Sequence, residues 1–256
     1  NEAGYSCSFI DIESNSSRAV GEILRAYMIV SIDSFKSFDF VLKYNKSIKF
    51  MTINFSLPGY PSVCADESSG GAMAARLFHE KEHSHVAVFT ELDDVCFRLR
   101  QQAFASTFKM LNPKCVVDTI VFAKHKPGEP PDAQHKLALK RYFSSVSAMP
   151  SGFFCTNGYA TMVLYKHLRA KGFSIPDEVA LLGYDNERFY DFIETPLSRI
   201  VFSLDDYSAV VSTQILNELQ GKMPVPTSTL VPVRLIDNHS IIELSSMHQK
   251  ESEKAI

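Results

Sequence analysis

Residues 175–186 read Ile175-Pro-Asp-Glu-Val-Ala-Leu-Leu-Gly-Tyr-Asp-Asn186, a short apolar run set between turn residues. A run of this length with turn signals on both sides is typical of a buried strand in a parallel sheet. The helical pattern before it closes at Gly172, and Pro176 lies just beyond, as expected after the end of a helix. The stretch therefore predicts a helix, a turn and a buried strand at Val179–Leu182, with Asp185 just past the end of the strand.

The same alternation of short apolar runs and amphipathic segments extends along the whole chain. We expect strands at Tyr5–Ile12, Tyr27–Ile32, Lys49–Phe55, Val86–Thr90, Val116–Phe122, Gly152–Cys155, Val179–Leu182 and Thr229–Ile236. We expect helices at Ser17–Ala26, Phe38–Asn45, Gly70–Lys81, Val95–Leu111, Asp132–Ser144, Tyr159–Lys171 and Asp206–Leu219. The first helix runs directly into the next strand, so either both elements are shorter or residues are absent between them. The pattern predicts an α/β fold with parallel sheets covered on both faces.

Composition excludes several classes of protein. The 256 residues are 45% hydrophobic and 21% charged, which suits one domain or two closely joined lobes. The net charge of -3 provides no basic surface for phosphates, so we do not expect the chain itself to bind DNA. Its five scattered cysteines (Cys7, Cys64, Cys96, Cys115, Cys155) fit reduced thiols in a cytosolic protein. No apolar run is long enough for a membrane span.

Six segments occur in an order that matches a known family. They are Asp66 with Gly70–Gly71 and His83, then Arg98–Phe104, Phe153–Asn157, Ile175–Asn186, Thr195–Ile200, and Leu230–Ile236 with Ser240. In this order they resemble the LacI/GalR family of bacterial transcription regulators. The residues Ile53–Ser56 and Gly70–Ala75, with Asp93–Asp94, are closest to the arabinose-responsive regulators of that family. The chain departs from the pattern at Glu82 and Ala103, which replace glycines, and at Gly158, which replaces an acidic residue.

The resemblance implies a periplasmic-binding-protein-like fold: two parallel-sheet lobes joined by three crossing strands, with a small molecule bound between the lobes. We expect the crossings near Cys64–Asp66, Phe202–Leu204 and Ser228–Leu230. The first lobe would then comprise residues 1–64 with about 203–228, and the second 65–202 with about 229–242, before a flexible tail at 243–256. The resemblance also implies a homodimer and a separate N-terminal DNA-binding module, and we expect that module and the first strand to be missing from this sequence.

Polar residues near the carboxyl ends of the predicted strands are the candidate ligand contacts, because ligands of parallel α/β sheets bind beyond those ends. They are Asn54, Asp66, Asn157 and Asp185, joined by Arg100 from the helix after Val86–Thr90. Carboxylates, amides and a guanidinium fork suit sugar hydroxyls, which both donate and accept hydrogen bonds.

Each of these residues has an alternative, structural role. Asp185, Asn157 and Asp66 are also suited to capping the helices that follow them. One of Arg98 and Arg100 is expected to be solvated. The sugar ring needs an apolar surface, for which Phe202 is a candidate, although it also suits a core position. His125 falls where some relatives of the family place an aromatic residue.

The sequence carries no pattern of catalysis or of metal binding. His83 and His85 form a His-x-His pair, but without a third ligand in view we expect them on the surface. Asp93–Asp94 and Asp205–Asp206 suit the first turns of helices. No nucleophile motif, phosphate loop or dinucleotide motif occurs, so we expect neither an enzyme nor a cofactor.

The main hypothesis is therefore a cytoplasmic effector-sensing domain that binds a small molecule, a sugar being favoured over a nucleobase or a phosphorylated sugar. In this hypothesis it acts on operator DNA through the missing module, without contact with a membrane. The alternative is a solute-binding protein of a sugar transport system, which shares the fold. The scattered, odd number of cysteines and the Gly183–Asn186 signature favour the regulator.

Overall fold

The computed structural model describes residues 17–26, 28–32, 41, 43–44, 48–57, 59–222 and 228–247. The chain divides into two compact units, residues 1–64 with 205–231 and residues 65–204 with 232–256, and passes between them after residues 64, 204 and 231. The strand expected at Tyr5–Ile12 lies outside the described residues. Of the helix expected at Phe38–Asn45, residues 41, 43 and 44 are described, and they are helical.

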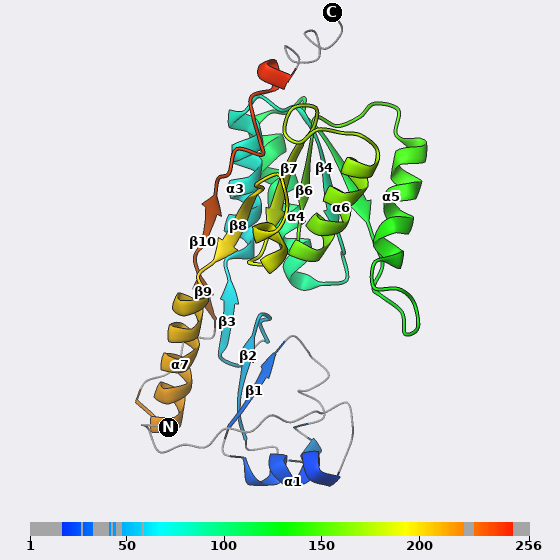
Figure 1. The fold of residues 1–256 in the computed structure, drawn as a ribbon. Helices are drawn as coiled ribbons and strands as arrows, with labels where there is room; N and C mark the ends of the chain where they lie inside the picture. The colour runs from blue at the N-terminus through cyan, green and yellow to red at the C-terminus, as the bar shows by residue number, and fades with distance from the viewer. Residues whose placement is uncertain are drawn as a thin grey trace, which may run out of the picture. The chain divides into compact units, whose positions relative to one another are not determined.

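The first unit contains a four-stranded sheet (Figure 1). Its strand order is β1-β2-β3-β9, with β1 at Met28–Ile32, β2 at Lys49–Ile53, β3 at Ser62–Ala65 and β9 at Thr229–Val231. The pairs β1–β2 and β2–β3 are parallel. The helix α1 ends at Arg25 and β1 begins at Met28, so the predicted helix and strand are both shorter and leave room for a turn. The helix α7 (Leu204–Gln220) carries Asp205 and Asp206 in its first turn, as predicted.

The second unit contains a six-stranded sheet with the order β10-β8-β7-β6-β4-β5. The strands are β4 (His85–Thr90), β5 (Val116–Val121), β6 (Gly152–Cys155), β7 (Ala180–Tyr184), β8 (Ser198–Phe202) and β10 (Val233–Ile236). All neighbours pair in parallel except β10, which runs antiparallel to β8. The strand expected at Thr229–Ile236 is in fact two strands in different sheets, separated at Pro232. Proline has no amide hydrogen for a sheet ladder, which suits it to this break. The strands β3 and β8 were not among those predicted.

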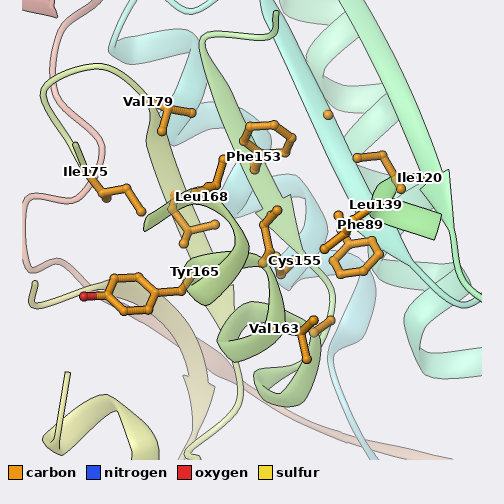
Figure 2. Packing of buried hydrophobic residues seen from close by; sticks show 14 of the residues in the cluster. Phe89, Ile120, Leu139, Phe153, Cys155, Val163, Tyr165, Leu168, Ile175 and Val179 are labelled. Atoms are coloured by element: carbon orange, nitrogen blue, oxygen red, sulfur yellow. The ribbon is translucent and has the colours of Figure 1, made fainter. Parts of the chain in front are cut away.

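Helices cover both faces of this sheet (Figure 1). On one face, Phe154 of β6 stacks on Phe104 of α4 (Val95–Leu111), which packs against α3 (Glu67–Glu80). On the other face, Phe153 packs against Phe143 of α5 (Ala133–Ser145). The helix α6 (Gly158–Ala170) covers the same face, where its side chains meet those of Phe89, Phe153 and Cys155 (Figure 2). The observed fold is the predicted α/β fold with parallel-sheet lobes, and β7 is buried along its whole length.

His83 is buried rather than exposed, so its predicted surface position is wrong. Its side chain is 1% exposed, with Nδ1 2.7 Å from the Ser151 hydroxyl and Nε2 3.1 Å from the Ile242 carbonyl. The helix α3 ends without a glycine, as expected, because Glu82 itself takes a left-handed conformation (φ 63°). Its hydrogen-bond partners Ser151 and Ile242 lie far along the chain, so this part of its surroundings could not be read from its neighbours in sequence.

The tail expected at 243–256 is described only as far as Met247. Residues 244–247 are helical, and the Met247 side chain is buried. The Leu244 amide donates to the Lys81 carbonyl just after α3. These four residues are therefore packed onto the second unit.

Burial of His83 makes stability depend on pH. Burial lowers the pKa of its imidazole from 6.5 to about 4. Between these values the unfolded chain binds a proton that the folded chain excludes, so the free energy of unfolding decreases as the pH falls from about 6.5 toward 4. One such group contributes at most about 1.4 kcal/mol per pH unit.

We expect His83→Gln to reduce the dependence of the free energy of unfolding on pH by up to the contribution of one proton, about 1.4 kcal/mol per pH unit. The measurement is urea unfolding at a series of pH values. The control is His239→Gln, since the His239 side chain is 88% exposed. Equal slopes in the His83 variant and the unmodified chain would show that His83 does not couple folding to protonation.

Candidate functional site

The order of strands in the second unit identifies where its sheet can bind a ligand. After β4 the chain continues to β5 on one side, and after β5 it returns to β6 on the other side of β4. In open parallel sheets, such a reversal leaves a crevice beyond the carboxyl ends of the strands concerned. A pocket of about 370 Å³ lies there. Its lining consists of Glu91, Phe97, Phe122, Ala123, His125, Pro131, His135, Asn157, Gly158, Tyr159, Asp185 and Glu187.

Beside this pocket, the Arg100 guanidinium is buried among carboxylates. It is 4% exposed, and its Nε and Nη2 donate to the two oxygens of Glu67 at 2.5 and 2.9 Å. Its Nη1 donates to the Thr156 carbonyl at 2.5 Å and to Oδ1 of Asp185 at 3.1 Å. The guanidinium carbon lies 3.6 Å from the centre of the Tyr184 ring. Burial disfavours the charged form, but the carboxylates outweigh it and raise the pKa of Arg100.

Two glycines allow α3 to carry Glu67 to this guanidinium. A Cβ atom on Gly71 would lie 2.2 Å from the Arg100 carbonyl oxygen, and one on Gly70 would lie 2.1 Å from the Tyr184 hydroxyl. Those distances are far below van der Waals contact, so α3 can approach α4 and β7 this closely only without side chains here. The Tyr184 hydroxyl in turn donates to Glu67 at 3.1 Å.

Asp185 connects Arg100 to the start of α6. Its Oδ1 accepts from Arg100, its Oδ2 accepts from the Gly158 amide at 3.2 Å, and its backbone is left-handed at φ 70°. The short helix that follows it, η1 (Arg188–Asp191), is capped at Glu187, so Asp185 does not cap the helix that follows it. A Cβ on Gly158 would lie 2.2 Å from the Glu187 side chain, which gives the departure from the family pattern at this position a physical reason.

The capping roles considered for two other candidates are present. Asn157 accepts from the Ala160 amide at 2.7 Å and caps α6, and it also lines the pocket. Asp66 accepts from the Ser69 amide at 3.0 Å and caps α3, and it is not among the residues that line the pocket. Likewise, Asp94 caps α4 through the amides of Cys96 and Phe97, as its place before the helix predicted.

The remaining candidates are dispersed. His125 lines the pocket, with Nε2 2.6 Å from the Glu129 carbonyl oxygen. Phe202 is half-buried at the end of β8 and does not line the pocket. Asn54 belongs to the first unit, where its Oδ1 lies 2.7 Å from the Tyr207 hydroxyl. The pocket therefore contains Asn157, Asp185 and His125 from the predicted set, with Arg100 in direct contact with Asp185.

Several functional residues were missed by sequence reasoning. Glu91 directly follows β4, so the rule that selected Asn157 and Asp185 also applies to it. Burial and the neighbouring carboxylates of Asp94 and Asp93 raise its pKa, while Lys124, 3.7 Å away, lowers it. Glu67 and Tyr184 show no such signal, because their roles depend on contacts between distant segments.

Aromatic rings form the apolar wall of the pocket, and they too were not predicted. The His135 ring is stacked on Phe122, with centroids 4.0 Å apart, and the Tyr159 ring is edge-on to it. Burial lowers the pKa of His135 from 6.5 to about 4. Its ring is therefore neutral near pH 7 and serves as part of the aromatic wall.

Over the described ranges, no cluster of three or more histidine, cysteine, aspartate or glutamate side chains is arranged to hold a metal ion. In the same part of the chain, no helix has the length and apolar character needed to cross a membrane.

Comparison with known proteins identifies the family. A model described as the periplasmic binding protein-like domain matches residues 75–241. The chain belongs to this family.

Its relatives include named repressors. Over 133 residues the domain is 24% identical to the HTH-type transcriptional repressor PurR of Histophilus somni (strain 129Pt), a match that covers 52% of this chain and 38% of the repressor. This chain thus spans less than half the length of that curated relative.

Solved structures share the fold. A LacI family transcriptional regulator from Enterococcus faecalis V583 with bound ribose has a TM-score of 0.72 at 22% identity, covering 89% of this chain and 82% of that one. A dimeric Lac repressor with a C-terminal deletion has a TM-score of 0.70 at 14% identity, covering 88% and 82%. The chain accordingly shares its fold with these LacI-family structures.

The Arg100–Glu67 pair is expected to be essential for the stability of this domain. Removing one partner of a buried ion pair leaves an uncompensated charge and costs about 3 to 5 kcal/mol. We expect Glu67→Gln and Arg100→Met each to lower the free energy of unfolding by such an amount, and the double variant to cost less than their sum.

The measurement is urea unfolding of all three variants. The control is Lys136→Gln, which breaks an exposed pair with Asp132 and should cost less than about 1 kcal/mol. If the double variant lowers the free energy of unfolding by the full sum of the two single changes, the predicted coupling between Arg100 and Glu67 is contradicted.

Proposed function

We propose that this chain is the effector-sensing domain of a bacterial transcription regulator of the LacI/GalR type, and that its effector is a sugar bound at the pocket of the second unit. The observation that carries the proposal is this pocket at the reversal of strand order, with carboxylate, amide and aromatic groups around it. The six ordered motifs and the repressor relative support a regulator.

The pocket suits a polyhydroxylated ring. Asp185 is 24% exposed and, beyond the bonds from Arg100 and Gly158, offers lone pairs to ligand hydroxyls. The Asn157 side chain lies next to it and adds an amide. The rings of Phe97, Phe122 and Tyr159 provide the apolar surface on which the C–H face of a sugar can rest. The ribose in the E. faecalis regulator is a precedent for such a ligand on this fold.

The remaining parts of the proposal rest on the family resemblance. We infer a homodimer whose paired N-terminal modules bind operator DNA in the cytoplasm, with no catalytic activity in this domain. An effector alters such a regulator only by binding its two conformations with different affinities. Asn54, Asp66 and Phe202 remain predicted ligand contacts. The assignment to the arabinose-responsive branch of the family also remains a prediction.

A solute-binding protein of a sugar transport system is the second candidate, because the fold alone serves both functions. The repressor relative favours the regulator. The native gene distinguishes the two candidate functions. It is expected to encode an upstream DNA-binding segment if the protein is a regulator, and a signal peptide if it is a transport protein.

Ligand binding is tested by the melting temperature. From a panel of neutral sugars, amino sugars, sugar phosphates and purines, we expect a sugar to raise the melting temperature by a few degrees, because a ligand at about 100 times its Kd adds about 2.7 kcal/mol of stability. The shift in melting temperature should disappear in Asp185→Asn, because this change removes the negative charge but keeps the shape of the side chain.

The matched control is Glu194→Gln, whose carboxylate is 87% exposed and outside the pocket, and it should respond like the unmodified chain. A panel that stabilises none of these proteins would contradict the proposed function.

A further inference from the structure

Histidines aside, the charged groups that line the pocket are all acidic. Glu91, Asp185 and Glu187 contribute three carboxylates, and the described residues of the lining include neither lysine nor arginine. A neutral sugar requires acceptors, but it does not require three negative charges in one pocket. The excess of negative charge therefore selects among ligands.

The cations that contact Asp185 and Glu91 are already paired with carboxylates. Arg100 is buried and donates to both Glu67 and Asp185, so with both carboxylates ionised this cluster keeps a net charge of -1. The Lys124 ammonium lies 3.7 Å from Glu91 but is 65% exposed, where solvent weakens its field. Neither group is left to receive an anionic ligand.

Two amides at the positive end of α6 are occupied as well. Helix N-termini commonly bind anions through free amides. Here the Gly158 amide donates to Asp185 and the Ala160 amide donates to the side chain of Asn157. An anionic ligand would have to displace these internal partners and approach Glu187, which packs against Gly158.

The aromatic wall adds attraction for a cation. The rings of Phe97, Phe122 and Tyr159 line the same pocket as the carboxylates. The negative face of an aromatic ring attracts an ammonium group, and the attraction strengthens when the group leaves water. His135 is stacked within this wall and is uncharged near pH 7, so it does not repel a cation.

We propose that the effector of this pocket carries a protonated amine, as in an amino sugar, and that the carboxylates of Glu91 and Glu187 select it over sugar phosphates. This inference rests on the proposed function, which requires that a sugar binds here. The neutral ring would meet Asp185 and Asn157, while the ammonium group would lie against the remaining carboxylates.

The test is calorimetric titration of the chain at low salt with three matched pairs: D-glucosamine and D-glucose, D-galactosamine and D-galactose, D-glucose 6-phosphate and D-glucose. We expect an amine to bind about tenfold or more tightly than its neutral parent, because each tenfold preference needs only about 1.4 kcal/mol. The preference should shrink when salt is added, while binding of the neutral sugar stays the same.

Charge-removing variants identify the residues responsible. Glu187→Gln, at an exposed position, and Glu91→Gln should each reduce the preference for the amine over its neutral parent several-fold. Glu194→Gln, outside the pocket, should keep the full preference.

The outcomes separate this inference from the proposed function. If the sugar phosphate binds most tightly, or if a neutral sugar binds as well as its amine in every variant, the effector is not a cation. Either result would contradict this inference but not the proposal that the domain senses a sugar. Absence of binding by every compound, here and in the panel described above, would overturn both.

Discussion

The second unit depends on one buried cation. A guanidinium at 4% exposure is tolerated only when its charge is paired and its donors are satisfied. Arg100 meets both conditions through Glu67, Thr156 and Asp185, which come from α3, the end of β6 and the end of β7. None of these elements can shift without leaving a charge or a donor unpaired. The pair thus fixes the edge of the sheet where the pocket lies.

The position of the pocket follows from this constraint. Asp185 is held by Arg100 on one oxygen and by the start of α6 on the other, in a left-handed conformation that costs free energy for a residue other than glycine. Its carboxylate is consequently oriented before any ligand arrives. Preorganisation of this kind lowers the cost of ordering side chains on binding. Glu91 and Glu187 are less constrained, and their charges act on whatever ligand Asp185 helps to hold.

Local patterns predicted the parts of this arrangement that depend on neighbours in sequence. The buried strand β7, the capping roles considered as alternatives for Asn157 and Asp66, and the placement of Asn157 and Asp185 at strand ends follow from short stretches with clear signals. The roles of Glu67 and Tyr184 do not, because each depends on contacts across many residues, Tyr184 with Glu67 above all. The burial of His83 was missed because its hydrogen-bond partners Ser151 and Ile242 are distant in sequence. The break at Pro232 did have a local signal, the proline itself.

The buried Arg100 ion pair and the acidic, aromatic pocket beside it have separate roles in ligand binding. Arg100 is largely unavailable as a direct donor to a ligand, since four of its five N–H donors are used within the protein. Its effect on a ligand is exerted through Asp185, whose orientation it sets and whose charge it only partly offsets. Discrimination between ligands then depends on Glu91, Glu187 and the rings around them, which can change without disturbing the core. A fold with this separation can acquire a new effector by substitution at the pocket wall while its central ion pair, and hence its stability, stays intact.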